Sequence, residues 1–148
     1  MFERSGCIKM EKIKSLLNQG TPLALLLVRL SVGIIFIQSG YAKLTHLSGT
    51  TDFFTQLHIP FPAANALIAS STEFFGGILI LVGFLTQWVA LPMAFVMVIA
   101  ILTAQLPQIK GLDELVGLQE WDYLLFFVLL FFIGAGRISL DGWFSRKK

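Results

Sequence analysis

Charge is scarce in this sequence. Only 14% of its 148 residues are Asp, Glu, Lys or Arg, against about a quarter in an average soluble domain. The formal net charge is only +2, and no basic patch with interleaved aromatic residues is present, so we expect no nucleic-acid partner. The hydrophobic share of 55% and the mean hydropathy of +0.77 instead indicate a chain whose partner is the lipid bilayer.

Cysteine and histidine are rare as well. Cys7 is the single cysteine, which excludes an internal disulfide and a CxxC dithiol. His46 and His58 are the only histidines, and both lie in one connection outside the hydrophobic runs. A haem inside a helical bundle needs axial ligands on the helices. We therefore predict no covalently held or metal-bound cofactor.

Four long hydrophobic runs are present. They predict membrane spans at about residues 22–44, 63–84, 87–106 and 121–138, because a helix rises ~1.5 Å per residue and must cross ~30 Å of hydrocarbon. The very short turn around Thr86 makes the second and third spans antiparallel neighbours. We predict an all-α fold, an integral membrane four-helix bundle with antiparallel helices, as a single domain over residues 1–148.

Shorter segments flank these runs. Residues 8–19 form a weak basic amphipathic pattern, which predicts a helix on the membrane surface. Gly20-Thr21-Pro22 then opens the first span, since proline is tolerated at a helix start. Residues 50–57 predict a short interfacial helix. Met10 is a second plausible start, so residues 1–9 are an optional extension, and no cleavable signal peptide is expected.

The cations are placed asymmetrically. Lys110 is the only cation within the two long connections, and Lys43 stands at the edge of one. The chain ends carry Arg4, Lys9, Lys12 and Lys14 before the first span, and Arg146, Lys147 and Lys148 after the fourth. The positive-inside rule therefore predicts that both termini are cytoplasmic.

A few ionisable residues interrupt the runs. In the first span one helix face carries Arg29, Gly33, Phe36, Gly40 and Lys43. Glu73 lies near the middle of the second span, and by helix rise its depth differs from that of Arg29 by only ~5 Å. We therefore predict that Arg29 and Glu73 pair, because an unpaired charge in the bilayer is strongly disfavoured. The glycines predicted to serve helix packing are Gly33, Gly40, Gly76, Gly77, Gly134 and Gly136.

A second polar group is predicted at the opposite end of the spans. Its members are Lys43, Gln105, Glu120, Asp122 and Tyr123. Together with Arg29 and Glu73, these are the candidate ligand-binding residues, and no catalytic role is assigned to any of them. Two interpretations of the buried charges stay open. They are functional groups, or they only fix the register of the helices, and Lys43 either binds or snorkels to the interface.

Three motifs together resemble the DoxX family of small four-helix bacterial membrane proteins. The first is Arg29-x3-Gly33-x6-Gly40-x2-Lys43. The second is Glu73-Phe74-Phe75-Gly76-Gly77, followed by Gly83. The third is Gly134-Ala135-Gly136-Arg137-Ile138-Ser139-Leu140-Asp141. The resemblance covers about Leu23 to Asp141 and implies a multi-pass protein of the bacterial inner membrane. Some members resemble, or serve as, subunits of quinone-linked oxidoreductases, and others are linked to oxidative-stress complexes.

Three functions remain open. The first is a small membrane subunit of a redox system that binds a quinone, with electrons supplied by a partner enzyme, because the sequence has no haem, flavin or iron–sulfur ligation pattern. The second is a non-catalytic scaffold or assembly partner, including a homo-oligomer. The third is a small proton-linked transporter, for which Glu73 would carry the proton. We expect no catalysis by the chain alone.

Overall fold

Helices make up most of the described part of the molecule. The computed structural model describes residues 3–146, except the side chains of residues 3–19 and Gln108. No strand occurs among these residues. The four longest helices are α1 (Glu3–Thr45), α3 (Pro62–Val82), α4 (Thr86–Ala100) and α6 (Gln119–Ile133). The short ones are α2 (Leu47–Gln56), α5 (Leu112–Val116) and α7 (Leu140–Ser145).

Three segments are long and apolar enough to cross a membrane. They are Gly20–Thr45 of α1, Pro62–Val82, and Thr86–Gln105, where α4 continues into a π-helical turn at Ile101–Gln105. The predicted fourth span, 121–138, corresponds to α6, which has only 15 residues and rises ~22 Å. It stops at Ile133 because Gly134 adopts a φ of 76°. The structure is thus all-helical with three candidate spans.

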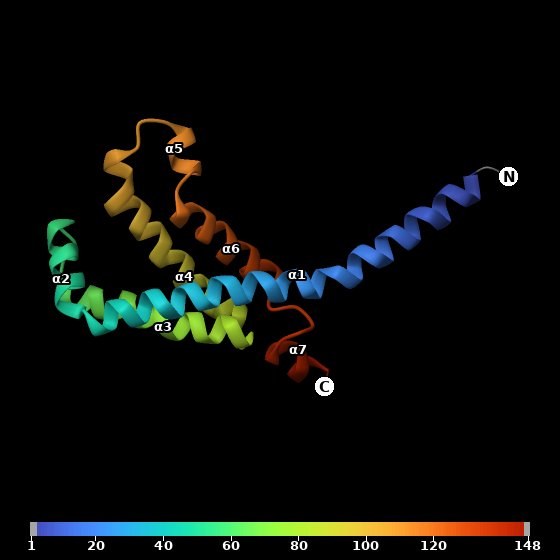
Figure 1. Ribbon diagram of the computed structural model, residues 1–148, viewed down its shortest axis with the longest axis horizontal. Coiled ribbons are helices and arrows are strands. Elements are labelled where there is room, and N and C mark those ends of the chain that lie inside the picture. Colours follow the sequence, from blue (N-terminus) through green and yellow to red (C-terminus); the bar gives the residue numbers. More distant parts are fainter. Residues whose placement is uncertain (1–2, 147–148) are drawn as a thin grey trace.

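The long helices pack around one apolar core. Figure 1 shows α3 running beside α1, and α4 beside α6, with α2 at one end of α1 and α7 near the turn between α3 and α4. Phe36 of α1 contacts both Tyr123 and Phe127 of α6 edge to face, with ring centroids 5.1 Å apart in each pair. The buried core consists of Val32, Phe36, Ile80, Ala90, Met93, Met97, Phe127 and Leu130.

The outer surface of the long helices is apolar. Phe75 of α3, Phe95 of α4 and Phe132 of α6 are 59%, 64% and 75% exposed. A protein dissolved in water rarely exposes so large an apolar surface. These side chains therefore belong in the lipid, and this agrees with the composition.

Glycines let α1 and α3 approach closely. A Cβ added at Gly40 would overlap the backbone of Phe74, and one added at Gly77 would lie 2.8 Å from the backbone nitrogen of Ile37. Gly33 lies against Leu81 in the same way. As the position on α1 rises, its neighbour on α3 falls, so the two helices are antiparallel and their register is set by these contacts.

The first helix differs from its prediction. We expected a surface helix at residues 8–19, separated from the first span at Gly20-Thr21-Pro22. Instead α1 is one continuous helix from Glu3 to Thr45, with Pro22 inside it. The fixed φ of proline, about −65°, is compatible with a helix, so Pro22 can lie inside α1 with helical residues on both sides of it. In Figure 1 the N-terminal part of α1 extends away from the other helices.

Replacing Gly40 with Ala should loosen the α1–α3 contact. The new methyl group overlaps backbone atoms of Phe74, which cannot rotate away, so we expect a loss of about 1–3 kcal/mol of stability. Thermal unfolding in lipid nanodiscs measures this as a lower midpoint. Gly49→Ala is the matched control, because nothing lies within 4 Å of a Cβ there. Equal midpoints for the two variants would contradict the packing.

Candidate functional site

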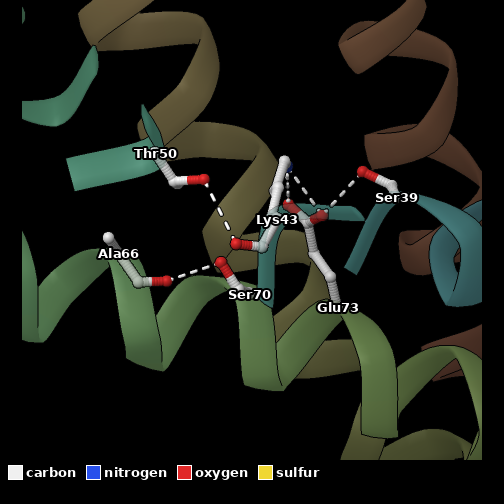
Figure 2. Close-up of polar contacts among 6 residues, drawn as sticks. All are labelled: Ser39, Lys43, Thr50, Ala66, Ser70 and Glu73. Carbon is white, nitrogen blue, oxygen red and sulfur yellow. Dashed lines mark hydrogen bonds and ion pairs between the residues drawn. The ribbon is translucent and has the colours of Figure 1, made fainter. Parts of the chain in front are cut away.

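Glu73 is a buried carboxylate with three polar contacts. It lies in the middle of α3 and is only 2% exposed. The Lys43 ammonium donates to both of its oxygens, at 2.6 and 2.7 Å, and the Ser39 hydroxyl donates to Oε2 at 2.9 Å. Figure 2 shows the three side chains converging between α1 and α3. Two of the contacts form an ion pair, so the charge of the carboxylate is neutralised locally.

The sequence of α1 brings both partners to Glu73. Ser39 and Lys43 are four residues apart, so they lie on one face of the helix. Gly40, between them, admits the α3 backbone at Phe74. The Lys43 side chain is 39% exposed while that of Glu73 is 3% exposed, so the lysine reaches inward from a partly open position. The site therefore has one side that a ligand can approach.

Neighbouring hydroxyls bond to backbone carbonyls around the pair. Thr50 of α2 donates to the Lys43 carbonyl at 3.4 Å, and Ser70 donates to the Ala66 carbonyl at 2.7 Å (Figure 2). The first of these bonds ties α2 to the end of α1 that carries Lys43. Each hydroxyl donates its hydrogen bond to a backbone carbonyl, so neither donates to the Glu73 carboxylate.

The predicted pair of Arg29 and Glu73 is wrong. Because Gly40 packs on Phe74, Glu73 is level with the residue after Gly40 on α1. Arg29 lies 12 residues before that level, a rise of ~18 Å. Our prediction placed both charges by counting from assumed span borders, and the helix contacts set a different register.

Arg29 instead binds backbone carbonyls. It is 1% exposed, and its Nη1 donates to the carbonyls of Ala135 at 2.5 Å and Ile138 at 3.0 Å. Its Nη2 donates to the Leu81 carbonyl at 3.4 Å. The guanidinium thus joins the end of α3 to the segment after α6. A Cβ at Gly83 would lie 2.6 Å from Nη1, so glycine makes the room for this contact.

Asp141 makes a second set of contacts in the same region, and we call Arg29, Asp141 and the backbone groups that they bind the clamp. Its carboxylate accepts hydrogen bonds from the backbone amides of Leu85 at 2.9 Å and Thr86 at 3.0 Å. These amides belong to the start of α4, where an acceptor is needed and a negative charge is favourable. The Asp141 amide donates to the Gly83 carbonyl at 3.0 Å. Arg29 and Asp141 therefore hold the C-terminal segment against the α3–α4 turn.

Gly134 and Gly136 have a role other than helix packing. Both follow α6 and adopt φ angles of 76° and 77°, a region that other residues rarely enter. They allow the chain to turn so that the carbonyls of Ala135 and Ile138 face Arg29. Gly76, in contrast, lies against Met93 and lets α4 approach α3.

The second predicted group is divided in the structure. Gln105, in the π-helical turn, donates to Glu120 at 3.1 Å. Tyr123 packs against Phe36 in the core, and Asp122 is exposed. Among the described residues Lys43 forms its ion pair with Glu73 and none with the carboxylates of α6.

Comparison with known proteins gives the family. A sequence profile of DoxX matches residues 24–106. The chain belongs to the DoxX family. It is 29% identical to “Putative oxidoreductase CatD” of Bacillus subtilis over 134 residues, which is 89% of this chain and 95% of that one. It is 32% identical to “Inner membrane protein YphA” of Escherichia coli over 127 residues, or 81% of this chain and 89% of YphA. No solved structure matches.

Sequence reasoning missed two parts of this DoxX protein. Ser39 was not singled out, although its place one turn before Lys43 is a usable signal. The clamp carbonyls of Leu81, Ala135 and Ile138 leave no signal in the side chains, because the acceptors are backbone atoms. Asp141 was part of the third family motif, but no role was assigned to it from the sequence.

Double-mutant cycles should separate the two pairings. Lys43→Gln and Glu73→Gln remove the two ends of one ion pair, so their effects on unfolding free energy should be non-additive by about 0.5–3 kcal/mol. Arg29→Gln and Glu73→Gln should add to within about 0.5 kcal/mol, because their side chains share no contact. Chemical or thermal unfolding in nanodiscs gives these energies. Additive effects for Lys43 and Glu73, with non-additive effects for Arg29 and Glu73, would contradict the structure and support an Arg29–Glu73 pair.

Proposed function

We propose that this DoxX protein is a small inner-membrane subunit of a redox system and that it binds a quinone beside Lys43. One observation carries the proposal: a partly exposed ammonium is held between α1 and α3 by a buried carboxylate. Such a group can donate to a quinone carbonyl without moving. A partner enzyme supplies or accepts the electrons.

The chemistry of the Lys43 ammonium supports this role. It carries three N–H donors, and two contacts engage the oxygens of Glu73. One donor is therefore left for a ligand oxygen. A ligand site of this type combines an apolar slot with few polar groups. Ser39 and Phe36 lie three residues apart on α1, and Phe36 packs on Tyr123, so aromatic rings lie one helical turn from the polar group.

The relatives add support of a different kind. CatD is named an oxidoreductase and covers most of this chain. YphA and a second Escherichia coli relative, YqjF, are both named inner membrane proteins. We propose the same membrane for this chain, with α6 and the segment behind it as a fourth crossing that completes an antiparallel four-helix bundle. Both termini would then be cytoplasmic.

A scaffold without ligand chemistry is the second candidate. The observation that favours it is the clamp, in which Arg29 hydrogen-bonds, among the described residues, to backbone carbonyls and so has a structural role. Glu73, too, is satisfied by residues of this chain. In this case the exposed surfaces would dock a partner protein or a second copy, and Lys43 would only neutralise Glu73.

Quinone binding is tested with the full chain in nanodiscs. Added menaquinone or ubiquinone should raise the thermal midpoint of the wild type. Lys43→Gln should weaken binding roughly tenfold or more, since a hydrogen bond from a charged donor contributes about 1.5–3 kcal/mol. Lys43→Arg should retain part of the binding, and Lys110→Gln is the control, because Lys110 is exposed and lies in the second connection. No shift with any quinone would favour the scaffold.

Thiol labelling tests the orientation. Cys7 is the native thiol, and we expect an impermeant maleimide to label it only after the inner membrane is opened. A Gln56→Cys variant in a Cys7→Ser background should be labelled in intact spheroplasts, since the proposed orientation puts Gln56, the last residue of α2, on the side opposite to the termini. Labelling of both thiols without permeabilisation, or of neither, would refute this orientation.

A further inference from the structure

A cavity of about 530 Å³ lies at the clamp end of the molecule, away from Lys43. Its walls come from the α3–α4 turn, the first turn of α4, the segment after α6, and α7, which lies near that turn in Figure 1. The lining includes the aromatic rings of Phe84, Trp88 and Phe144. It also includes Gln87, Gly136 and Asp141. Apolar and polar groups therefore meet in one hollow.

Two backbone amides at or next to the cavity have no hydrogen-bond partner among the described residues. Within residues 20–146 the backbone amides of Gly136 and Arg137 donate no hydrogen bond, in contrast to the Asp141 and Gly142 amides a few residues later. Gly136 itself lines the cavity. A backbone amide without a partner in the protein can donate to an acceptor on a ligand. A ligand with several oxygens can accept from both amides.

The local charge favours an anion. Arg137 and Arg146 directly follow the lining residues Gly136 and Ser145, and both are exposed. In the described part of the chain neither forms an ion pair. Asp141 also lines the cavity, but its two oxygens already accept from the Leu85 and Thr86 amides. Its charge also interacts with Arg29. The two exposed arginines therefore make the charge at the cavity positive.

The aromatic side chains place the cavity at a membrane surface. Trp88 is 75% exposed and Phe144 is 52% exposed, and tryptophan is enriched where hydrocarbon meets headgroups. The apolar flank continues from here along α6 through Ile133 and Phe132, which are 53% and 75% exposed. An acyl chain can follow that flank while its headgroup stays near the arginines.

We propose that this cavity binds the phosphate headgroup of an anionic phospholipid. The phosphate would accept from the Gly136 and Arg137 amides and from the arginine side chains, and Trp88 would contact the start of an acyl chain. Basic pockets beside membrane helices bind lipid headgroups in this manner. The site is distinct from the proposed quinone site, so it stands whether or not a quinone binds.

Trp88 offers a local probe. In the full chain with Trp121→Phe and Trp143→Phe, Trp88 is the only tryptophan. In nanodiscs, phosphatidylglycerol with brominated chains should quench its fluorescence more than brominated phosphatidylcholine at equal content. Removing both arginines, as Arg137→Gln with Arg146→Gln, should weaken the preference roughly fivefold per charge, on a scale of about 1 kcal/mol for each cation.

Two further arms make the result decisive. Ser145→Glu adds a negative charge at the cavity and should abolish the preference, whereas Gln56→Glu, which adds the same charge on exposed α2, should leave it intact. Inorganic phosphate added to phosphatidylcholine discs should not reproduce the effect of phosphatidylglycerol on the thermal midpoint. Equal quenching by the two lipids, equal effects of the two glutamates, or full replacement by free phosphate would each overturn the proposal.

Discussion

The burial of one carboxylate constrains much of this structure. A charged residue near the middle of a membrane helix costs about 2.5–3.5 kcal/mol even on insertion scales, and Glu73 has this position in α3. It is tolerated because the Lys43 ammonium and the Ser39 hydroxyl reach it from α1. That contact requires the backbones of the two helices to approach, which Gly40 permits. The register of α1 on α3 and the ion pair therefore depend on each other.

The two ends of the α1–α3 pair stabilise their buried charges in different ways. At one end a side-chain cation meets a side-chain anion. At the other, Nη1 and Nη2 of Arg29 donate to the carbonyls of three different residues, and Asp141 accepts from amides at the start of α4. In a bilayer each exposed backbone group needs a partner within the protein. The clamp thus uses two charges to stabilise the ends of α3, α4 and α6.

The sequence predicted elements better than contacts. Hydrophobic run lengths located α3 and the Thr86–Gln105 span within two residues, because apolar length is a direct consequence of bilayer thickness. They failed at the end of α6, where a positive φ at Gly134 rather than polarity stops the helix. The pairing of Arg29 failed because depth counted from borders cannot give helix register. Register depends on which glycine faces which backbone, and that is settled only in three dimensions.

The account of the site depends most directly on the contact between Lys43 and Glu73. It can be measured directly in lipid by solid-state NMR, as the dipolar coupling between ¹⁵Nζ of Lys43 and ¹³Cδ of Glu73. The structure predicts a strong coupling, as N–O separations of 2.6 and 2.7 Å require. No coupling to Lys43, together with a strong coupling from Glu73 to the Arg29 guanidinium, would contradict the account.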